Sequence, residues 1–503
     1  SRASSPEDRQ RKHLGSSWPP KVRLAYAGLC IALLLANYFL AQYDKFILSY
    51  FQTPLSRSLD LTATEYGVIS GYSTGIVYAL SAIPVAYLAD TFRSARIWIL
   101  SIAALWSSLC VIFQSISRNF WQLLLARIGM GLGQSCIEPL SVSLISDLSG
   151  GWRNVFIGAS VFYFGVYIGE AISGQIATAF SDNQEGWRVA LRAIGITGAV
   201  IAVLMRLIIH DQARLPGIVV DDDIYTQRAA VSEHVRWAKS RVGVTLSYVV
   251  RMRSFWLLLL ASSARLLAGN VFGFYMPSYL ANTYQENDQL FSHYGIIAGV
   301  VGSFAVLSGG ALSSIFWEKT KTTPLWITAV GGIISSVFVL IMVFSRDIAG
   351  GDARAGTKIL YGSMSAAYIT AELWLGALNG LITSLLPPKH KTFGLAIWGT
   401  LQILIYSSGP LIVGLCLQGL DPGSAAYTRS TQVILAVIIP LGYCLAGTGF
   451  LLARPLLKRD IAQGVDMERP LSRRRRGLLG LFVVLVGSMV VALIIANIYY
   501  STK

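Results

Sequence analysis

The sequence predicts an all-α polytopic membrane protein of two six-helix bundles with an additional C-terminal thirteenth transmembrane helix. Of the 503 residues, 54% are hydrophobic and only 13% are charged, about half the charged fraction of an average soluble protein. Apolar runs of about 20 residues recur along the whole chain, and a run of that length crosses the hydrocarbon core of a bilayer. A polar segment at 210–253 separates the first six runs from the next six.

The apolar runs define the order of the elements. The predicted spans are 24–52, 63–89, 95–117, 120–148, 153–180, 188–209, 254–283, 291–317, 323–345, 358–386, 392–418, 429–454 and 477–500. The chain therefore divides into a cytoplasmic N-terminal tail at 1–23, a bundle at 24–209, a cytoplasmic linker at 210–253, a second bundle at 254–454, a basic cytoplasmic segment at 455–476 and the additional helix at 477–503.

Basic residues set the predicted orientation. The tail, the loops after the even-numbered spans and the segment after span twelve together hold 29 of the 41 Lys and Arg residues. The positive-inside rule assigns that side to the cytoplasm. The N-terminus is then cytoplasmic and the C-terminus lumenal or extracellular. An endomembrane of the lysosomal kind and the plasma membrane are both compatible with this pattern.

The net charge of +15 does not indicate nucleic-acid binding, because the basic residues lie in short loops between apolar runs and not on a soluble domain. The five cysteines lie inside apolar runs without CxxC spacing, and the five histidines form no ligand-spaced pair. There is no phosphate-binding GxxxxGK[ST] loop. We therefore expect no metal, no cofactor and no enzyme activity.

Span four carries the clearest functional signal. In FWQLLLARIGMGLGQSCIEPLSVSLISD, Arg127, Gly131, Gln134 and Glu138 are spaced to share one helix face. An ionisable residue in hydrocarbon costs at least ~2.5 kcal/mol, so such residues mark partners, cavities or substrate paths. Glu138 precedes Pro139, where a helix loosens and frees a backbone carbonyl.

Further ionisable residues lie inside other spans: Asp44 and Lys45 in span one, Glu170 in span five, Arg265 in span seven and Glu372 in span ten. Arg265 is roughly 16 Å from the cytoplasmic start of its span, too deep to reach the interface easily. It suits a phosphate or carboxylate headgroup. With Glu372 it forms either a structural pair or part of a headgroup site.

Short echoes relate the two halves. LLLAN ends at Asn37 in span one, and LLAGN ends at Asn270 in span seven. Phe156-Ile-Gly-Ala in span five is echoed 237 residues later by Phe393-Gly-Leu-Ala in span eleven. Duplicated bundles place a substrate site near the membrane midplane between the repeats.

The loop between spans two and three reads AYLADTFRSAR at 86–96. It resembles the GxxxD(R/K)xGR(R/K) signature of the major facilitator superfamily, with alanine at both glycine positions. Asp90, Arg93 and Arg96 match the charged positions of this gating motif. The resemblance implies the major facilitator fold, in which two bundles rock about a central site.

Within that superfamily the first six spans resemble the Spinster family. The resembling stretches are 37–38, 43–45, 120–135, 145–148, 161–164 and 187–192. The resemblance implies transport of lysophospholipids or sphingosine-type lipids, with proton coupling in some members. The family's Asp-Arg pair maps onto Asp44 and Lys45, and its span-four arginine onto Arg127.

The family's span-four glutamate falls on Gln134, which cannot take up a proton. Glu138, one turn further along, is the expected substitute. Two readings of Asp44, Arg127 and Glu138 stay open: a proton switch, and a static buried ion pair that joins helices.

We expect a secondary active transporter for a lipid-like or small amphipathic solute, with protons as the coupling ion and membrane lipids around it. The candidate substrate and coupling residues are Asn37, Asp44, Lys45, Arg127, Gln134, Glu138, Glu170, Arg265, Asn270 and Glu372. The alternative is a non-transporting subunit or receptor of a larger membrane complex, docked to a membrane-protein partner through 477–500.

Overall fold

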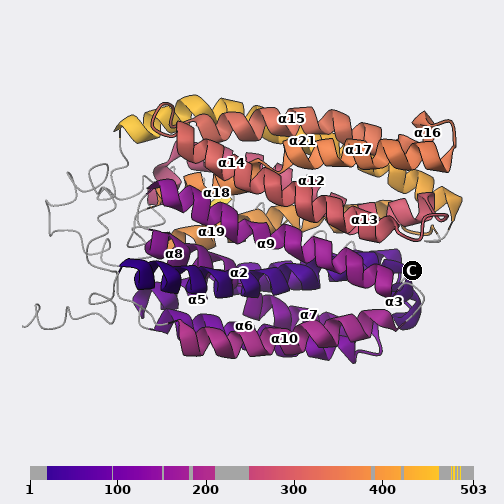
Figure 1. Cartoon of the computed structure of the whole chain (residues 1–503), viewed down its shortest axis with the longest axis horizontal. Helices are drawn as coiled ribbons and strands as arrows, with labels where there is room; N and C mark the ends of the chain where they lie inside the picture. Colours follow the sequence, from indigo (N-terminus) through magenta and orange to yellow (C-terminus); the bar gives the residue numbers. More distant parts are fainter. Residues whose placement is uncertain are drawn as a thin grey trace, which may run out of the picture.

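The computed structural model describes residues 20–92, 95–149, 152–180, 185–209, 248–386, 391–420 and 424–463, with isolated helical positions between 477 and 488. Its regular elements in these ranges are helices arranged as two bundles side by side (Figure 1). The first bundle contains α2 (Pro20–Tyr50), α3 (Gln52–Leu59), α4 (Ala63–Ser70), α5 (Tyr72–Thr91), α6 (Arg96–Ser115), α7 (Phe120–Gln134), α8 (Ile137–Ser149), α9 (Trp152–Ala179) and α10 (Gly186–Ile208).

The second bundle begins after the linker. It contains α12 (Arg253–Thr283), α13 (Leu290–Ile297), the π-helical turn η3 (Ala298–Gly302), α14 (Ser303–Phe316), α15 (Thr323–Val343), α16 (Ser345–Ile348), α17 (Ala353–Ala371), α18 (Trp374–Leu385), α19 (Lys391–Tyr406), α20 (Ser408–Cys416) and α21 (Ala425–Gln463). Within the described residues, ten helical spans are long and apolar enough to cross a membrane. The chain is an integral, multi-pass membrane protein, and the predicted fold class is confirmed.

Predicted spans four and ten are not among those ten spans, because each is interrupted near its middle. The chain leaves the helix at Ser135 and Cys136, between α7 and α8, and again at Glu372 and Leu373, between α17 and α18. The two breaks are 237 residues apart, the spacing that relates the sequence repeats. The prediction of one continuous helical face from Arg127 to Glu138 is therefore wrong.

Each break has a local physical cause or compensation. Pro139 has no N–H to offer the carbonyl of Ser135, so the helical ladder is incomplete at that point. At the second break, Arg265 Nη2 donates to the carbonyl of Ala371 at 3.2 Å. An ordered break in a membrane helix requires such internal partners.

The bundles meet at both ends of the membrane-spanning region. At the end that the predicted orientation places outside the cytoplasm, called the outer end, Gln175 of α9 and Ser292 of α13 exchange two hydrogen bonds of 2.9 and 3.0 Å. At the opposite end, which the prediction places in the cytoplasm and which is called the cytoplasmic end, Thr392 of α19 donates to Ser143 of α8 at 2.8 Å. The bundles therefore contact each other at both ends of the membrane-spanning region.

Small residues allow the bundles to approach closely. Ala86 of α5, one of the two departures from the signature motif, is fully buried in a cluster with Ala396 of α19. On the other side, a Cβ added to Gly310 of α14 would lie 1.8 Å from the hydroxyl of Ser160 in α9. Side chains this small are typical of membrane helix interfaces.

Several predictions fall outside the described residues. They concern the tail up to residue 19, most of the linker, the segment 464–476 and nearly all of the thirteenth span. The exact boundaries of the six predicted segments therefore stay a prediction. Of the gating motif, Arg96 is buried at the start of α6, whereas Arg93 and the side chain of Asp90 are not described.

Candidate functional site

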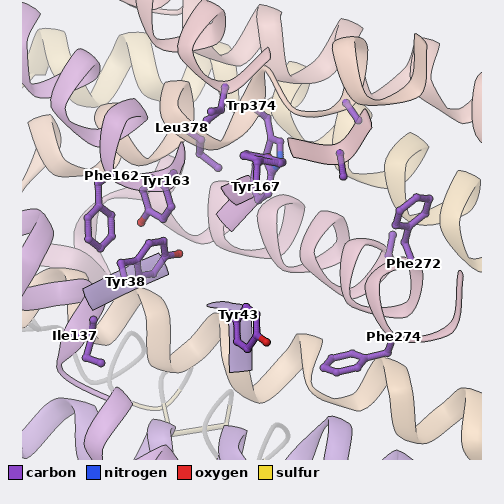
Figure 2. Packing of buried hydrophobic residues seen from close by; sticks show 14 of the residues in the cluster. Tyr38, Tyr43, Ile137, Phe162, Tyr163, Tyr167, Phe272, Phe274, Trp374 and Leu378 are labelled. Carbon is purple, nitrogen blue, oxygen red and sulfur yellow. The ribbon is translucent and has the colours of Figure 1, made fainter. Parts of the chain in front are cut away.

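A central cavity of about 200 Å³ lies between the bundles and is lined by both. Six of the predicted site residues line it: Lys45, Glu138, Glu170, Arg265, Asn270 and Glu372. Its remaining wall is rich in aromatic side chains, which include Tyr38, Tyr78, Tyr163, Tyr167, Phe274, Tyr368, Trp374, Tyr406 and Tyr443. Figure 2 shows several of these rings extending from both bundles into the interface. A charged and aromatic cavity of this kind suits an amphipathic solute.

On the N-terminal side, Glu138 is held by one tyrosine. Tyr163 Oη of α9 donates to Glu138 Oε1 at 2.6 Å. Tyr38 of α2 stacks on Phe162 with ring centroids 4.1 Å apart and meets Tyr163 edge-on at 5.8 Å (Figure 2). These rings fix the hydroxyl of Tyr163, so the carboxylate of Glu138 has a defined place at the cavity wall.

Lys45 is the cation of the same side. Its ammonium lies 5.7 to 6.0 Å from the ring centroids of Phe46, Phe274 and Tyr406, at the outer limit of a cation–π contact. The described part of the chain offers it no hydrogen bond or ion pair within bonding distance. Its charge interacts with that of Glu138 across the cavity wall, and no bonded partner blocks an anionic group from approaching it.

On the C-terminal side, Arg265 and Glu372 form an ion pair of 3.0 Å. The guanidinium also lies 3.7 Å from the ring centroid of Tyr443 and 5.3 Å from that of Trp374. A second oxygen of Glu372 accepts from Tyr167 at 2.6 Å. The predicted pairing of Arg265 with Glu372 is thus present, and its carboxylate also contacts the opposite bundle.

Glu170 is the third carboxylate of the cavity and is buried. Tyr368 Oη of α17 donates to its Oε1 at 2.8 Å. The backbone carbonyl of the same residue accepts a long bond of 3.5 Å from Tyr50. Glu170, like Glu372, therefore joins the two bundles.

Asp44 and Arg127 lie behind the cavity, inside the first bundle. Both side chains are 1% exposed, and their charges interact. Arg127 Nη1 donates to Gln114 Oε1 of α6 at 3.2 Å. Gln114 also interacts with the carboxylate of Asp44, which accepts no hydrogen bond of regular geometry among the described residues. This is a buried charged cluster separate from the cavity wall.

Two further predicted residues lie away from the wall. The described cavity lining does not include Asn37, which is buried in α2, or Gln134, which is half-buried at the end of α7.

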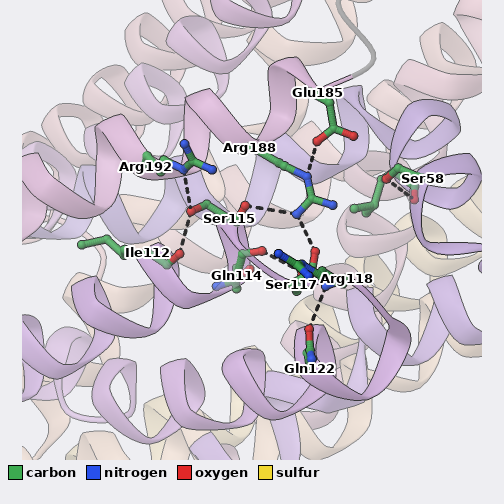
Figure 3. A network of polar contacts seen from close by, with 11 residues as sticks. Ser58, Ile112, Gln114, Ser115, Ser117, Arg118, Gln122, Glu185, Arg188 and Arg192 are labelled. Carbon is green, nitrogen blue, oxygen red and sulfur yellow. Dashed lines mark hydrogen bonds and ion pairs between the residues drawn. The ribbon is translucent and has the colours of Figure 1, made fainter.

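A polar network joins the C-terminal end of α6 to the N-terminal end of α10, next to the buried cluster (Figure 3). Arg188 of α10 donates to the carbonyls of Ser115 and Ser117 and also to Glu185. Arg192 donates to the hydroxyl of Ser115 at 3.3 Å. These bonds satisfy carbonyls at the C-terminal end of α6, next to Gln114, which holds Arg127.

We expect Arg188→Ala to lower the free energy of unfolding by about 1.5–3 kcal/mol, the value of hydrogen bonds from a charged donor. Thermal unfolding of the purified protein in detergent measures this loss. Arg118→Ala is the matched control. The side chain of Arg118 is exposed, and its bond to Gln122 comes from the backbone N–H, which the substitution keeps. Equal melting temperatures for both variants would contradict this role of Arg188.

The model of the Major Facilitator Superfamily matches residues 34–410. The chain belongs to this superfamily. Among its relatives, an MFS-type efflux pump of Mycolicibacterium smegmatis is 23% identical over 447 residues, which cover 88% of this chain and 95% of the pump. The sphingosine-1-phosphate transporter SPNS2 of Danio rerio is 26% identical over 362 residues, which cover 67% of this chain and 66% of that protein.

Solved structures of the superfamily share the fold. A bacterial homologue of the human lysosomal transporter Spinster, in an inward-facing and unoccupied conformation, matches with a TM-score of 0.62 and 17% identity. That match covers 88% of this chain and 99% of the homologue. The protein spinster of Drosophila melanogaster is 23% identical over 318 residues. The Spinster resemblance seen in the sequence is confirmed.

The hydrogen bonds from tyrosines to the carboxylates of the cavity were not predicted from the sequence. A signal was present, since Tyr163, Tyr167 and Glu170 follow the i, i+4, i+7 spacing of one helix face. Tyr368 and Glu372 are likewise four residues apart. Gln114 gave no such signal, because its role depends on the packing of α6 against α7.

Proposed function

We propose that this superfamily member is a secondary active transporter that moves a lipid-like (lysophospholipid or sphingoid-type) or small amphipathic solute by rocker-switch alternating access. The central cavity carries the proposal, because charged side chains of both bundles line one common space. A solute bound there contacts both halves, and rocking of one half against the other exposes it to either side. We assign the protein no enzyme activity.

The charges of the cavity support a polar headgroup with an apolar chain. Lys45 interacts with Glu138 through their charges but forms no ion pair within 4 Å among the described residues, and Arg265 is bound to one carboxylate. A phosphate or carboxylate is therefore attracted to Lys45 and can share Arg265. The aromatic wall supplies apolar surface for the rest of the molecule.

We propose protons as the coupling ion. Glu138, Glu170 and Glu372 line the cavity, and Asp44 is buried behind it opposite Arg127. Each can bind a proton in one conformation and release it in another. Because Lys45 follows Asp44 in α2 and interacts with Glu138, it links the buried cluster to the cavity. Asn37, Gln134 and Asn270 serve as neutral polar groups of the site in this proposal.

The remaining assignments concern topology and gating. We propose a cytoplasmic N-terminus, a lumenal or extracellular C-terminus, and residence in an endomembrane or the plasma membrane. Asp90, Arg93 and Arg96 form the gating motif at the cytoplasmic ends of α5 and α6. The helix 477–503 is the proposed contact for a membrane-protein partner.

A ligand-induced increase in thermal stability tests the substrate class. We expect sphingosine-1-phosphate to raise the free energy of unfolding by about 2.7 kcal/mol at a concentration a hundredfold above its dissociation constant. Sphingosine, which lacks the phosphate, is expected to act more weakly because Lys45 loses its partner. No shift with either lipid, together with a stoichiometric partner after purification in mild detergent, would favour the non-transporting subunit.

A further inference from the structure

Two tyrosine–carboxylate hydrogen bonds cross from one bundle to the other at the level of the second helix break. Tyr167 Oη of α9 donates to Glu372 Oε2 at 2.6 Å, and Tyr368 Oη of α17 donates to Glu170 Oε1 at 2.8 Å. Each side contributes one tyrosine and one glutamate. The pairing is reciprocal because spans five and ten cross the membrane in opposite directions.

The π-helical turn η3 makes room for one of these tyrosines. A Cβ added to Gly302 would lie 2.3 Å from Cδ1 of Tyr167, and one added to Gly299 would lie 2.4 Å from Cβ of Ala171. π-helical turns are rare and are frequently found at functional sites. This turn therefore seats the ring of Tyr167 from a third helix, independently of the hydrogen bonds.

Both carboxylates of the crossing bonds also line the cavity. Each is thus shared between the contact that joins the bundles and the space that a solute would occupy. Hydrogen bonds to an ionised carboxylate are about twice as strong as neutral ones. A solute group that donates to Glu170 or Glu372 therefore competes directly with a tyrosine hydroxyl.

We propose that Tyr167 and Tyr368 are positioning residues that latch the bundles together through Glu372 and Glu170, and that a hydrogen-bond donor entering the cavity releases the latch. The latch stands on the geometry of the described residues. Its release by a solute rests on the proposed transport function. In this way binding at the cavity changes the contact between the bundles without a separate sensor.

Cysteine cross-linking between the bundles tests the latch. One pair, Gln175→Cys with Ser292→Cys, reports the outer end, and another, Ser143→Cys with Thr392→Cys, reports the cytoplasmic end. Both are made in a chain in which Cys416 and Cys444 are replaced by alanine, because these two cysteines are not buried. In the absence of lipid, we expect Tyr167→Phe combined with Tyr368→Phe to slow cross-linking at one end by about tenfold or more. Rates within twofold of the parent at both ends would overturn the latch.

Two controls separate the latch from general loosening. Tyr163→Phe removes a tyrosine–glutamate bond of the same length that lies within one bundle, so cross-linking is expected to stay at the parent rate. Equal slowing by Tyr163→Phe would overturn the proposal. Gly302→Ala displaces the ring of Tyr167 but keeps its hydroxyl, and it is expected to slow cross-linking even if the double variant does not fold. Gly362→Ala in α17, with nothing within 4 Å of the added Cβ, is its matched control.

Sphingosine-1-phosphate then tests the release step. We expect the lipid to slow cross-linking of the parent toward the rate of the Tyr167→Phe, Tyr368→Phe double variant. The cross-linking rate of the double variant itself is expected to change little. If the tyrosine substitutions slow cross-linking and the lipid does not, the latch holds and the proposed substrate is wrong. If the substitutions have no effect, the latch is wrong whatever the lipid does.

Discussion

Arg265→Ala is expected to destabilise the protein by about 3–5 kcal/mol, because removing one partner of a buried ion pair leaves the other charge uncompensated. The substitution leaves the charge of Glu372 without its ion-pair partner and also removes the donor to the carbonyl of Ala371. Thermal unfolding in detergent measures the loss. The stability of Arg265→Lys is expected to lie between that of the parent and that of Arg265→Ala. Lysine keeps the positive charge but loses the planar contact with Tyr443.

A double variant separates the structural role of this pair from its role in binding. Arg265→Met with Glu372→Gln removes both charges and leaves an amide oxygen to accept from Tyr167. We expect most of the stability to return and lipid uptake to stay at least tenfold below that of the parent. Full uptake by the double variant would show that Arg265 and Glu372 are a structural pair only.

Glu138→Gln is expected to abolish accumulation of the solute against its gradient while exchange across the membrane continues. The amide still accepts from Tyr163 but cannot carry a proton between conformations. Proteoliposomes with an imposed pH gradient measure accumulation, and counterflow without a gradient measures exchange. We expect Glu138→Gln to lower accumulation at least tenfold and to change the exchange rate by less than about threefold.

Tyr163→Phe is the matched variant for this experiment, because it removes the hydrogen bond to Glu138 and keeps the carboxylate. It is expected to retain stimulation by the pH gradient. An unchanged proton dependence in Glu138→Gln would remove Glu138 from the coupling mechanism and leave Asp44, Glu170 and Glu372 as candidates.

The fold could be predicted from the sequence, because apolar runs mark the membrane spans and the repeat spacing marks the two duplicated halves. The sequence also brought Arg265 and Glu372 together, as either a structural pair or part of a headgroup site, because two isolated charges deep in hydrocarbon are stabilised by each other. The positions of Asp44 and Arg127 behind the cavity could not be predicted. Residues that face the interior of a bundle and residues that face the cavity recur with the same spacing along a helix.

The helix breaks were predictable only in part. Pro139 gave a sign of the first break, although the turn lies a few residues earlier, at Ser135. The second break, at Glu372, has no nearby proline and depends on the contact of Arg265 with the carbonyl of Ala371. The tyrosine hydroxyls that bind the carboxylates depend likewise on how the two bundles meet, which no local pattern specifies.

Uptake of sphingosine-1-phosphate by proteoliposomes containing only this protein is the most direct test of the proposed function. The measurement compares an imposed pH gradient, the same gradient collapsed by a protonophore, and protein-free liposomes. We predict saturable uptake that the gradient increases and that its collapse returns to simple equilibration. Uptake equal to that of protein-free liposomes under all three conditions, with lysophosphatidylcholine giving the same result, would contradict transport of a lipid-like solute.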